Sequence, residues 1–498
     1  MHILDWAVLT LYAVGMLAAG WYYSRRTATT DDFLLGGRNM SPWMVGLSLF
    51  ATLLSTLTYL AIPGEMIQFG PMVLSQLVAI PFICLVVGWL LIPLIMRQRV
   101  TSAYEILEMR FGLGVRMLGS CLFLSLRLFW MSLVIYATAS KVLVPILQLD
   151  PSAVRWVCVT LGLLTVAYTS MGGLRAVVLT DVVQTFILFG GAALVLILIA
   201  VDLGGVGAWW PREWPSHWQR PVFWIEPNVR FTFAGGFLSY FTWYVCTAGS
   251  DQMAVQRYLA TRDAPAARRM FNISLLSNVI LMPFLAVVGL ALMAYFLARP
   301  DMLPAGQTVW ESDELLPVFI MRGLPVGISG LIIAALLAAA MSSLSSGLNS
   351  VCSVVTSDFI DRFHKRKDTE RSHVRLAKYM SLAIGIVVVV LSTLFVHIKS
   401  ENLLEMCYKV ANLLTVPLFM LFFMAMFIPW ATAPGTWAGT VVSLLVVVAI
   451  AYQKELELDF MKNLGVSFVW MMPASFVSGA MTGMLVSLLP FRRRPMLA

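Results

Sequence analysis

The stretch VGLSLFATLLSTLTYLAIPGE, from Val45 to Glu65, is apolar enough to enter a membrane but contains residues that interrupt a helix. It lies within an apolar segment near 41–67, and about 20 apolar residues suffice to cross a bilayer. Four hydroxyl side chains interrupt the run: Thr52, Ser55, Thr56 and Thr58. Pro63-Gly64 then follows, and both residue types disfavour a continuous helix. The pattern predicts a broken transmembrane helix.

A second interrupted stretch, FAGGFLSYFTWYVCTAGSDQ from Phe233 to Gln252, lies five predicted spans further along the chain. It has Gly235-Gly236 near its start and a polar run from Thr247 to Asp251 near its end. Two interrupted segments at matching positions of two five-span halves indicate an inverted-repeat transporter with a binding site near the middle of the membrane. Ordinary packing of Ser, Thr and Gly between membrane helices is the alternative explanation.

The composition of the whole chain agrees with a protein of many membrane helices. Of the 498 residues, 59% are apolar and only 12% are Asp, Glu, Lys or Arg, whereas soluble domains average about 45–50% and about 25%. So few charges cannot cover a water-facing surface. The composition therefore excludes a soluble enzyme, a disordered chain and a nucleic-acid module. It also argues against a β-barrel, whose strands alternate apolar and polar residues.

Thirteen apolar segments predict about thirteen transmembrane helices. They lie near 3–23, 41–67, 71–95, 115–144, 153–170, 177–200, 231–254, 270–297, 324–358, 376–396, 407–428, 433–452 and 467–489. Of the 34 Lys and Arg residues, 22 fall on the inner side of this arrangement, 9 on the outer side and 3 within spans. Because Lys and Arg gather on the cytoplasmic side, we expect a cell-membrane protein with its N-terminus outside and its C-terminus inside.

The ninth segment carries a face of small and hydroxyl residues in AALLAAAMSSLSSGLNS, from Ala334 to Ser350. The spacing i, i+3, i+4, i+7 puts four residues on one face of a helix: Ala339, Ser342, Ser343 and Ser346. A hard cation such as Na⁺ binds several oxygen atoms at roughly 2.3–2.5 Å, and a broken second span would add freed carbonyl oxygens. The face predicts either a sodium site or close packing against another helix.

Charged residues within apolar segments are further candidates, because charge inside a membrane is costly and marks functional positions. Asp181 stands at the inner start of the sixth segment, and Arg175 is one candidate partner for it. Arg127 and Lys141 lie in the fourth segment, where Lys141 can extend to the interface. The six cysteines and five histidines form no CxxC pair and no cluster, so neither a disulfide framework nor a zinc site is predicted.

Five motifs follow one another along the chain: DDFLLGGRNM (31–40), TSAYEILEMRFG (101–112), YTSMGGLRAVVLTDVVQ (168–184), DQMAVQRYL (251–259) and AAAMSSLSSGLNS (338–350). In sequence, order and spacing they resemble the sodium/solute symporter family, which includes sodium-coupled glucose, iodide, monocarboxylate, multivitamin, proline and sialic acid transporters. The resemblance extends from about residue 5 to residue 490.

The resemblance implies an all-α polytopic membrane protein that is not an enzyme. Its core would be ten helices in two inverted repeats of five, with broken helices, one helix before the core and two after it. We therefore expect an N-terminal extra helix in 1–30, the two repeats in 31–230 and 231–430, and two C-terminal helices with a tail in 431–498.

The resemblance also implies where sodium binds. The general sodium site of the family uses backbone oxygens of the broken helix and the ninth span together with two hydroxyls. These positions correspond here to Ala51, Leu54, Ala339, Ser342 and Ser343. Some members have a second site with an aspartate and further serines, which this chain matches with Asp181, Ser342, Ser345 and Ser346. Na⁺ is thus expected as the coupling ion, one or two per cycle.

The same resemblance implies a substrate cavity lined by Leu53, Ser55, Thr58, Gln76, Trp130, Trp243, Tyr244, Thr247 and Asn412. In the sialic acid transporter an arginine of the fourth span holds the substrate carboxylate, and Trp130 falls at that position here. Arg127 lies one helical turn earlier, on nearly the same face. It either binds a substrate carboxylate through two parallel hydrogen bonds or pairs with lipid or a helix terminus.

The prediction is a sodium-coupled secondary active symporter that imports a small carboxylate-bearing solute, monocarboxylate-like or vitamin-like, by alternating access. GEMIQFG (64–70) and SLVIYATAS (132–140) look closest to the monocarboxylate, multivitamin and iodide branch. The sodium helix looks closer to the sialic acid and sugar branch, so a sodium/sugar or sialic acid symporter is the alternative.

Other classes of membrane protein fit less well. A channel would need a pore-lining ring, and a membrane enzyme would need clustered His, Asp or Glu. A sodium-independent uniporter and a transporter-like sensor stay open. The expected partners are the solute and the lipid bilayer, with no nucleic acid and no protein partner implied.

Overall fold

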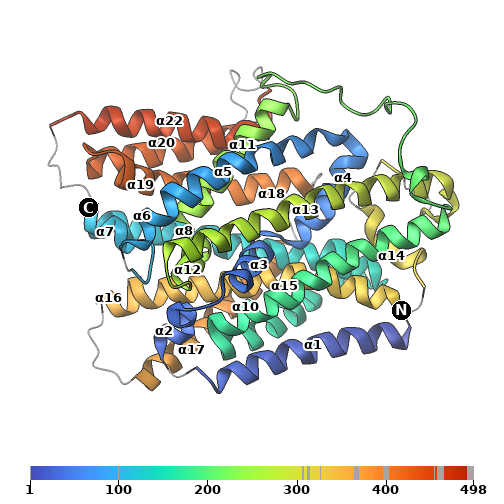
Figure 1. Cartoon of the computed structure of the whole chain (residues 1–498), viewed down its shortest axis with the longest axis horizontal. Coiled ribbons are helices and arrows are strands. Elements are labelled where there is room, and N and C mark those ends of the chain that lie inside the picture. Colours follow the sequence, from blue (N-terminus) through green and yellow to red (C-terminus); the bar gives the residue numbers. More distant parts are fainter. Residues whose placement is uncertain are drawn as a thin grey trace.

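The computed structural model describes the chain except for residues 1, 28, 99, 305–307, 311–313, 326, 364–369, 396–402, 454, 457–464 and 491–498. Helices are the only regular secondary structure among the described residues. Most of them run side by side along the long axis of the molecule, with α1 (Ile3–Ser24) at one edge and α20 (Ala433–Ala451) and α22 (Met471–Ser487) at the opposite edge (Figure 1). The predicted all-helical fold is confirmed.

Ten described helices are long and apolar enough to cross a membrane, and an eleventh span results if the bent pair α3 (Pro42–Leu53) and α4 (Thr56–Phe69) counts as one. The ten are Ile3–Ser24, Pro71–Met96, Leu113–Ile146, Pro151–Asp202, Ala264–Ala298, Ile328–Phe363, Glu370–Leu394, Leu404–Phe427, Ala433–Ala451 and Phe468–Ser487. All of them coincide with predicted apolar segments. The number thirteen itself stays a prediction, and part of the charge behind the predicted orientation (Lys365, Arg366, Lys367, Lys399 and Arg492 to Arg494) lies outside the described residues.

One reason for the lower count is α10 (Val154–Asp202), which contains two predicted segments, 153–170 and 177–200. A straight helix of 49 residues would extend about 70 Å, far beyond a hydrocarbon core of about 30 Å. The helix turns at Gly173, whose φ of 62° and ψ of −162° are not helical. A Cβ atom there would also lie 2.6 Å from the carbonyl oxygen of Phe33. Glycine is therefore required at this turn for two reasons.

The second predicted segment is broken, but at Leu54 and Ser55 and not at Pro63. Both break residues have extended backbone, and the axes of α3 and α4 differ by 65°. The hydroxyl of Ser55 accepts a hydrogen bond from the Thr58 amide at 3.3 Å and so caps the start of α4. Pro63 lies inside α4, where its carbonyl oxygen is closely approached by Gly289 of α13 (Ala264–Ala298). Membrane helices tolerate proline when neighbours fill the gap in bonding and packing.

The seventh predicted segment is also interrupted. It folds as α11 (Phe233–Ser250), then the extended residue Asp251 with φ −81° and ψ 122°, then α12 (Gln252–Leu259). The carboxylate of Asp251 accepts from the amide of Met253 at 2.9 Å, which caps α12. The sequence thus predicts both interruptions.

The ninth predicted segment forms α15 (Ile328–Val354), and every residue from Ala338 to Ser350 is buried. It lies in the interior of the bundle, in contact with α3, α10 and α8 (Leu113–Ala137). The remaining α-helices are α2 (Thr30–Leu35), α5 (Ile80–Val86), α6 (Ile92–Met96), α7 (Glu105–Phe111), α9 (Val144–Ile146), α14 (Leu315–Arg322), α16 (Asp361–Phe363), α17 (Glu370–Leu394), α18 (Leu403–Asn412) and α19 (Thr415–Phe427).

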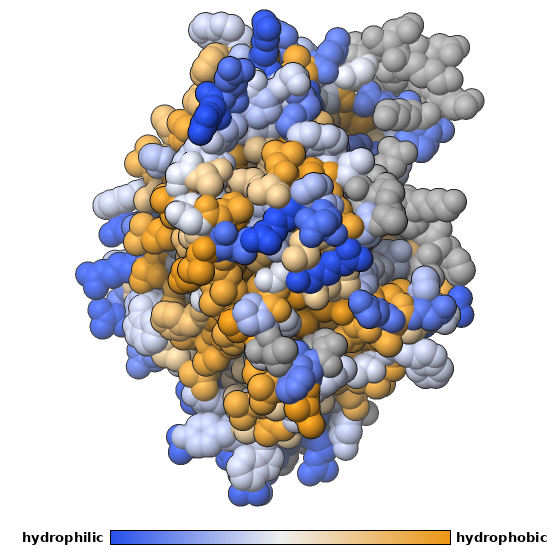
Figure 2. All heavy atoms as spheres, turned by 90° about the vertical axis from the view of Figure 1, so that its right-hand side faces the viewer, coloured by the Kyte–Doolittle hydropathy of each residue, from blue (hydrophilic) through white to orange (hydrophobic). Residues whose placement is uncertain are grey.

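The surface distribution of side chains suits a lipid environment. Large apolar side chains such as Leu11 and Trp156 are each 75% exposed, and tryptophan at a membrane surface favours the lipid–water boundary. Figure 2 shows the end of the bundle near the start of α1, where hydrophilic side chains gather in the middle and at the margins, between hydrophobic areas. Exposed apolar side chains such as these are what a membrane protein presents to lipid.

Candidate functional site

The break between α3 and α4 meets α15 at the residues predicted for the first sodium site. The hydroxyl of Ser342 donates to the carbonyl oxygens of Ala51 at 2.9 Å and Ala339 at 3.2 Å. The hydroxyl of Ser343 donates to the carbonyl oxygen of Leu54 at 2.8 Å. All five residues are buried. The structure therefore brings the complete predicted set into one cluster.

The break explains why carbonyl oxygens are available in this cluster. The last carbonyl groups of a helix have no partner within that helix, and α3 ends at Leu53. The carbonyl oxygen of Thr52 also accepts from Ser343, at 3.1 Å. Neutral carbonyl and hydroxyl oxygens are a donor set that suits a hard monovalent cation. The donor chemistry therefore fits Na⁺.

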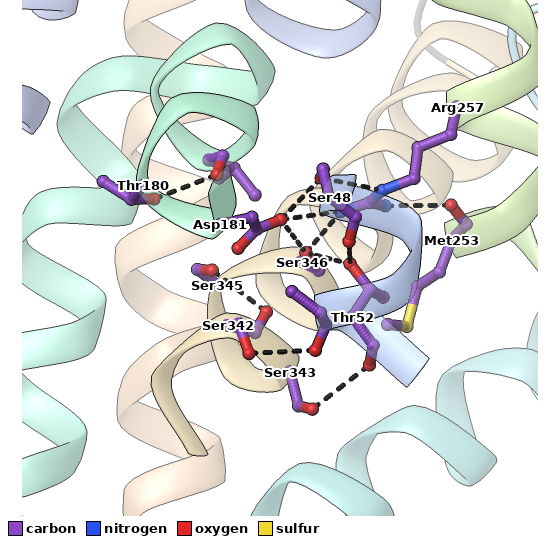
Figure 3. Close-up of polar contacts among 12 residues, drawn as sticks. Ser48, Thr52, Thr180, Asp181, Met253, Arg257, Ser342, Ser343, Ser345 and Ser346 are labelled. Carbon is purple, nitrogen blue, oxygen red and sulfur yellow. Dashed lines mark hydrogen bonds and ion pairs between the residues drawn. The ribbon is translucent and has the colours of Figure 1, made fainter. Parts of the chain in front are cut away.

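The second predicted sodium site centres on Asp181, in the part of α10 that follows Gly173. One carboxylate oxygen, Oδ2, accepts from the hydroxyls of Ser48 at 2.6 Å and Ser346 at 3.3 Å. The other, Oδ1, has no hydrogen-bond partner among the described residues. The hydroxyl of Ser345 donates to the carbonyl oxygen of Ser342 at 3.1 Å. Figure 3 shows Asp181 facing these serines of α15.

Arg257 of α12 joins this second cluster, although its sequence position beyond the seventh segment suggests an inner-loop charge. Its guanidinium is fully buried and lies 3.3 Å from Oδ2 of Asp181. It also donates to the Ser48 hydroxyl at 3.1 Å and bonds to Ser346 (Figure 3). The predicted pairing of Asp181 with Arg175 is wrong, because Arg175 pairs with Asp32 at 2.9 Å.

The predicted substrate residues gather around one cavity. Nine of the ten line it: Leu53, Thr58, Gln76, Arg127, Trp130, Trp243, Tyr244, Thr247 and Asn412. The tenth, Ser55, does not line it. Thr52 and Leu54 do, so the cavity adjoins the first sodium cluster. Tyr240 and Asn278, which the sequence does not predict, also line the cavity, and the Tyr240 hydroxyl donates to Oδ1 of Asn278 at 2.9 Å.

Arg127 lines this cavity but already has an acidic partner. Its guanidinium forms a buried ion pair with Asp251, the residue at which α11 ends and α12 begins. The predicted role of Arg127 in binding a substrate carboxylate stays a prediction. Arg127 and Gln76 both line the cavity, and each has a buried donor, Nε and Nε2 respectively, with no hydrogen-bond partner among the described residues.

Two further ion pairs lie away from the cavity lining. Lys141 lies 3.5 Å from Glu314 with both side chains well exposed, as expected for an interfacial lysine. Arg230 donates to both carboxylate oxygens of Glu65 at 3.0 Å, and the Glu65 side chain is almost fully buried on α4.

Comparison with known proteins places these features in a wider group. Residues 33–443 match the model of the sodium:solute symporter family. The chain is 31% identical over 475 residues to the sodium/sialic acid symporter SiaT of Proteus mirabilis, which covers 93% of this chain and 92% of that protein. It is 31% identical over 456 residues to the sodium-dependent multivitamin transporter of Oryctolagus cuniculus, which covers 89% of this chain and 69% of that protein.

A solved structure shows the same architecture. The substrate-bound outward-open state of a Na⁺-coupled sialic acid symporter matches with a TM-score of 0.82 and 28% sequence identity, covering 99% of each chain. The structural similarity therefore extends over nearly the whole chain.

Proposed function

Because the chain belongs to the sodium:solute symporter family, we propose that it is a secondary active symporter that couples Na⁺ entry to the import of a small carboxylate-bearing solute. Its family and relatives are transporters, so the chain is an integral membrane transporter and not an enzyme. Beyond family membership, we infer the class of solute, the binding residues, the number of ions and the location in the cell membrane.

The observation that carries the carboxylate proposal is that two cavity-lining side chains, Arg127 and Gln76, each have a buried donor (Nε and Nε2) without a hydrogen-bond partner among the described residues. A buried donor without an acceptor is costly, and a carboxylate offers about four acceptor positions. The aromatic rings of Trp130, Trp243 and Tyr244 supply apolar surface for the rest of a small solute. The vitamin-like form of the proposal is supported by the similarity to the multivitamin transporter.

For sodium, we propose that the first ion binds the oxygens of Ala51, Leu54, Ala339, Ser342 and Ser343. A second ion would bind Asp181 with Ser342, Ser345 and Ser346, and the unpartnered Oδ1 of Asp181 supports it. Arg257 argues against the second ion, because its guanidinium already supplies a positive charge beside this carboxylate. The proposal is therefore one or two ions per cycle.

The coupling mechanism follows from shared residues. Thr52 and Leu54 belong both to the first sodium cluster and to the cavity lining. An ion that holds the α3–α4 break against α15 therefore also orders one wall of the cavity and raises affinity for the solute. By reciprocity the solute raises affinity for Na⁺. In an inside-negative membrane each entering Na⁺ contributes about 2.3 kcal/mol per 100 mV.

We also propose that the N-terminus lies outside and the C-terminus inside, on the basis of the Lys and Arg distribution. The proposed division into 1–30, 31–230, 231–430 and 431–498 is supported by the positions of the two interrupted segments, one in each half.

A second candidate is a sialic acid symporter. It is supported by the similarity to SiaT over nearly the whole chain and by the TM-score of 0.82 to a sialic acid symporter. Trp130, at the position where the resemblance expects a carboxylate-binding arginine, argues against it.

A thermal-shift screen of the purified protein distinguishes these candidates. Small carboxylates, sugars, sialic acids, vitamins and iodide are each tested in NaCl and in KCl. We expect a carboxylate-bearing solute to raise the melting temperature in NaCl and not in KCl. Stabilisation by a sialic acid or a sugar alone would favour the second candidate. Equal stabilisation in both salts would contradict sodium coupling and indicate a uniporter or a sensor.

A further inference from the structure

The short helix α12 connects the two sites, because each of its two ion pairs belongs to one of them. Asp251, at its start, pairs with Arg127 of the solute cavity. Arg257, in its last turn, pairs with Asp181 of the second sodium cluster (Figure 3). Five residues lie between Asp251 and Arg257, so their Cα atoms are about 9 Å apart along the helix axis. A displacement of α12 therefore changes both pairs together.

Buried contacts with several neighbouring elements hold α12 in place. All eight of its residues are buried. The side-chain oxygen of Gln252 accepts from the Ala103 amide at 2.8 Å, and its nitrogen donates to the Thr101 carbonyl at 2.9 Å. Gln256 donates to the carbonyl oxygen of Leu34. A buried polar helix with partners on several elements has few alternative positions, so a displacement of one end also displaces the other end.

The charges at the two ends give the direction of this effect. A Na⁺ ion beside Asp181 repels the guanidinium of Arg257, which now neutralises that carboxylate. A solute carboxylate at Arg127 competes with Asp251 for the same guanidinium. Each ligand therefore weakens one of the two pairs that hold α12 in its present position.

We propose that α12 transmits the coupling between the sodium cluster and the solute cavity, with Asp251 and Arg257 as positioning residues. Two ligands that disfavour the same position of one element favour each other's binding. The inference rests on the proposed sodium site at Asp181 and adds the element that links it to the solute. It predicts that breaking the Arg127–Asp251 pair mimics the solute and raises affinity for Na⁺.

The test uses the purified full chain and Na⁺ alone as the ligand. Melting temperature is recorded against NaCl concentration at constant ionic strength, with KCl as the balancing salt. Asp251→Asn keeps the shape and the capping oxygen of the side chain but removes its charge. We expect the Na⁺ concentration that gives half of the stabilisation to fall by about fivefold or more, the lower end of ordinary coupling between sites.

Three further variants complete the design. The double variant Arg127→Gln with Asp251→Asn removes both charges and leaves no unpaired buried charge. It should lower the Na⁺ half-point as Asp251→Asn does, and it replaces that variant if Asp251→Asn alone is too unstable. Arg257→Gln should also lower the half-point, because it removes the competing cation. Glu65→Gln is the matched control, since it neutralises a buried carboxylate paired with Arg230, away from α12. It should leave the half-point unchanged.

The outcomes separate the inference from the proposed function. Half-points for Asp251→Asn and the double variant within about twofold of the wild type would overturn the role of α12, since ordinary coupling exceeds that. If Glu65→Gln lowered the Na⁺ half-point as much as Asp251→Asn does, the role of α12 would also be overturned. A wild-type protein with identical melting curves in NaCl and KCl would overturn the sodium site itself, and the inference with it.

Discussion

The hydroxyl of Ser343 donates a hydrogen bond to the carbonyl oxygen of Leu54 at 2.8 Å, across 289 residues of sequence. The contact joins the middle of α15 to the break between α3 and α4. Because Leu54 also lines the solute cavity, the same contact connects the proposed sodium site to the proposed solute site. The first prediction follows directly from it.

Ser343→Ala removes one proposed sodium ligand and leaves the backbone oxygens in place. Loss of one hydroxyl–Na⁺ contact should cost as much as loss of a hydrogen bond to a charged group, about 1.5–3 kcal/mol. The Na⁺ concentration for half-maximal uptake should therefore rise by about tenfold or more. Uptake into cells over a range of Na⁺ concentrations measures this. Ser478→Ala is the control, because among the described residues its hydroxyl bonds only to carbonyl oxygens of its own helix. Unchanged Na⁺ dependence with normal expression would refute the site.

Asp181 and Arg257 should behave as a coupled pair in stability. Removing one member of a buried ion pair leaves a buried unpaired charge, which costs about 3–5 kcal/mol. Asp181→Asn should therefore lower the melting temperature strongly, whereas Asp181→Asn with Arg257→Gln should recover much of the loss. A double-mutant cycle on purified protein measures the coupling. Strictly additive changes would show that the two side chains do not interact.

The same double variant tests the second sodium ion. If two ions bind, the wild type should show a Hill coefficient for Na⁺ above one, and the double variant a coefficient of one. Initial uptake rates against Na⁺ concentration give both values. A wild-type coefficient of one, together with a measured stoichiometry of one Na⁺ per solute, would exclude the second site.

Gln76→Leu should weaken solute binding without affecting sodium coupling. It removes the unpartnered donor of a cavity-lining side chain, and a hydrogen bond to a carboxylate is worth about 1.5–3 kcal/mol. The solute concentration for half-maximal uptake should rise by about tenfold, with the maximal rate and the Na⁺ half-point little changed. Uptake curves against solute concentration decide this. A change in the Na⁺ half-point alone would place Gln76 outside the solute site.

Gly173→Ala should prevent correct folding of α10. Its positive φ and the close approach of the Phe33 backbone both exclude a side chain. Gly190→Ala, in the same helix, is the matched control, because a Cβ at Gly190 would meet nothing within 4 Å. Detergent-extracted protein should run as a single peak on size-exclusion chromatography for the control and not for Gly173→Ala. Equal peaks would contradict the structural role of the turn.

The sequence predicts the all-helical membrane fold and both helix interruptions, because long apolar runs and clusters of hydroxyl residues are local properties. It does not locate the first break. Ser55 and Pro63 both disfavour a continuous helix locally, and the structure breaks the helix where the Ser55 hydroxyl caps a new one, while Gly289 packs against Pro63.

Periodicity also predicts that Ser342, Ser343 and Ser346 share a face of α15, but not what lies opposite that face. The partner of Asp181 is Arg257, 76 residues away, and not the nearby Arg175. The partner of Arg127 is Asp251, 124 residues away. Such pairs are set by how the helices pack, so a local motif such as DQMAVQRYL contains both Asp251 and Arg257 without indicating what each one contacts.

The most direct test of sodium coupling through the Ser343–Leu54 contact is solute-driven sodium flux. Purified protein is placed in proteoliposomes, an inward gradient of the solute identified by the thermal-shift screen is applied, and entry of radioactive Na⁺ is measured. We expect the solute gradient to increase Na⁺ entry in the wild type and not in Ser343→Ala. Na⁺ entry that is independent of the solute, or equal in the two proteins, would contradict it.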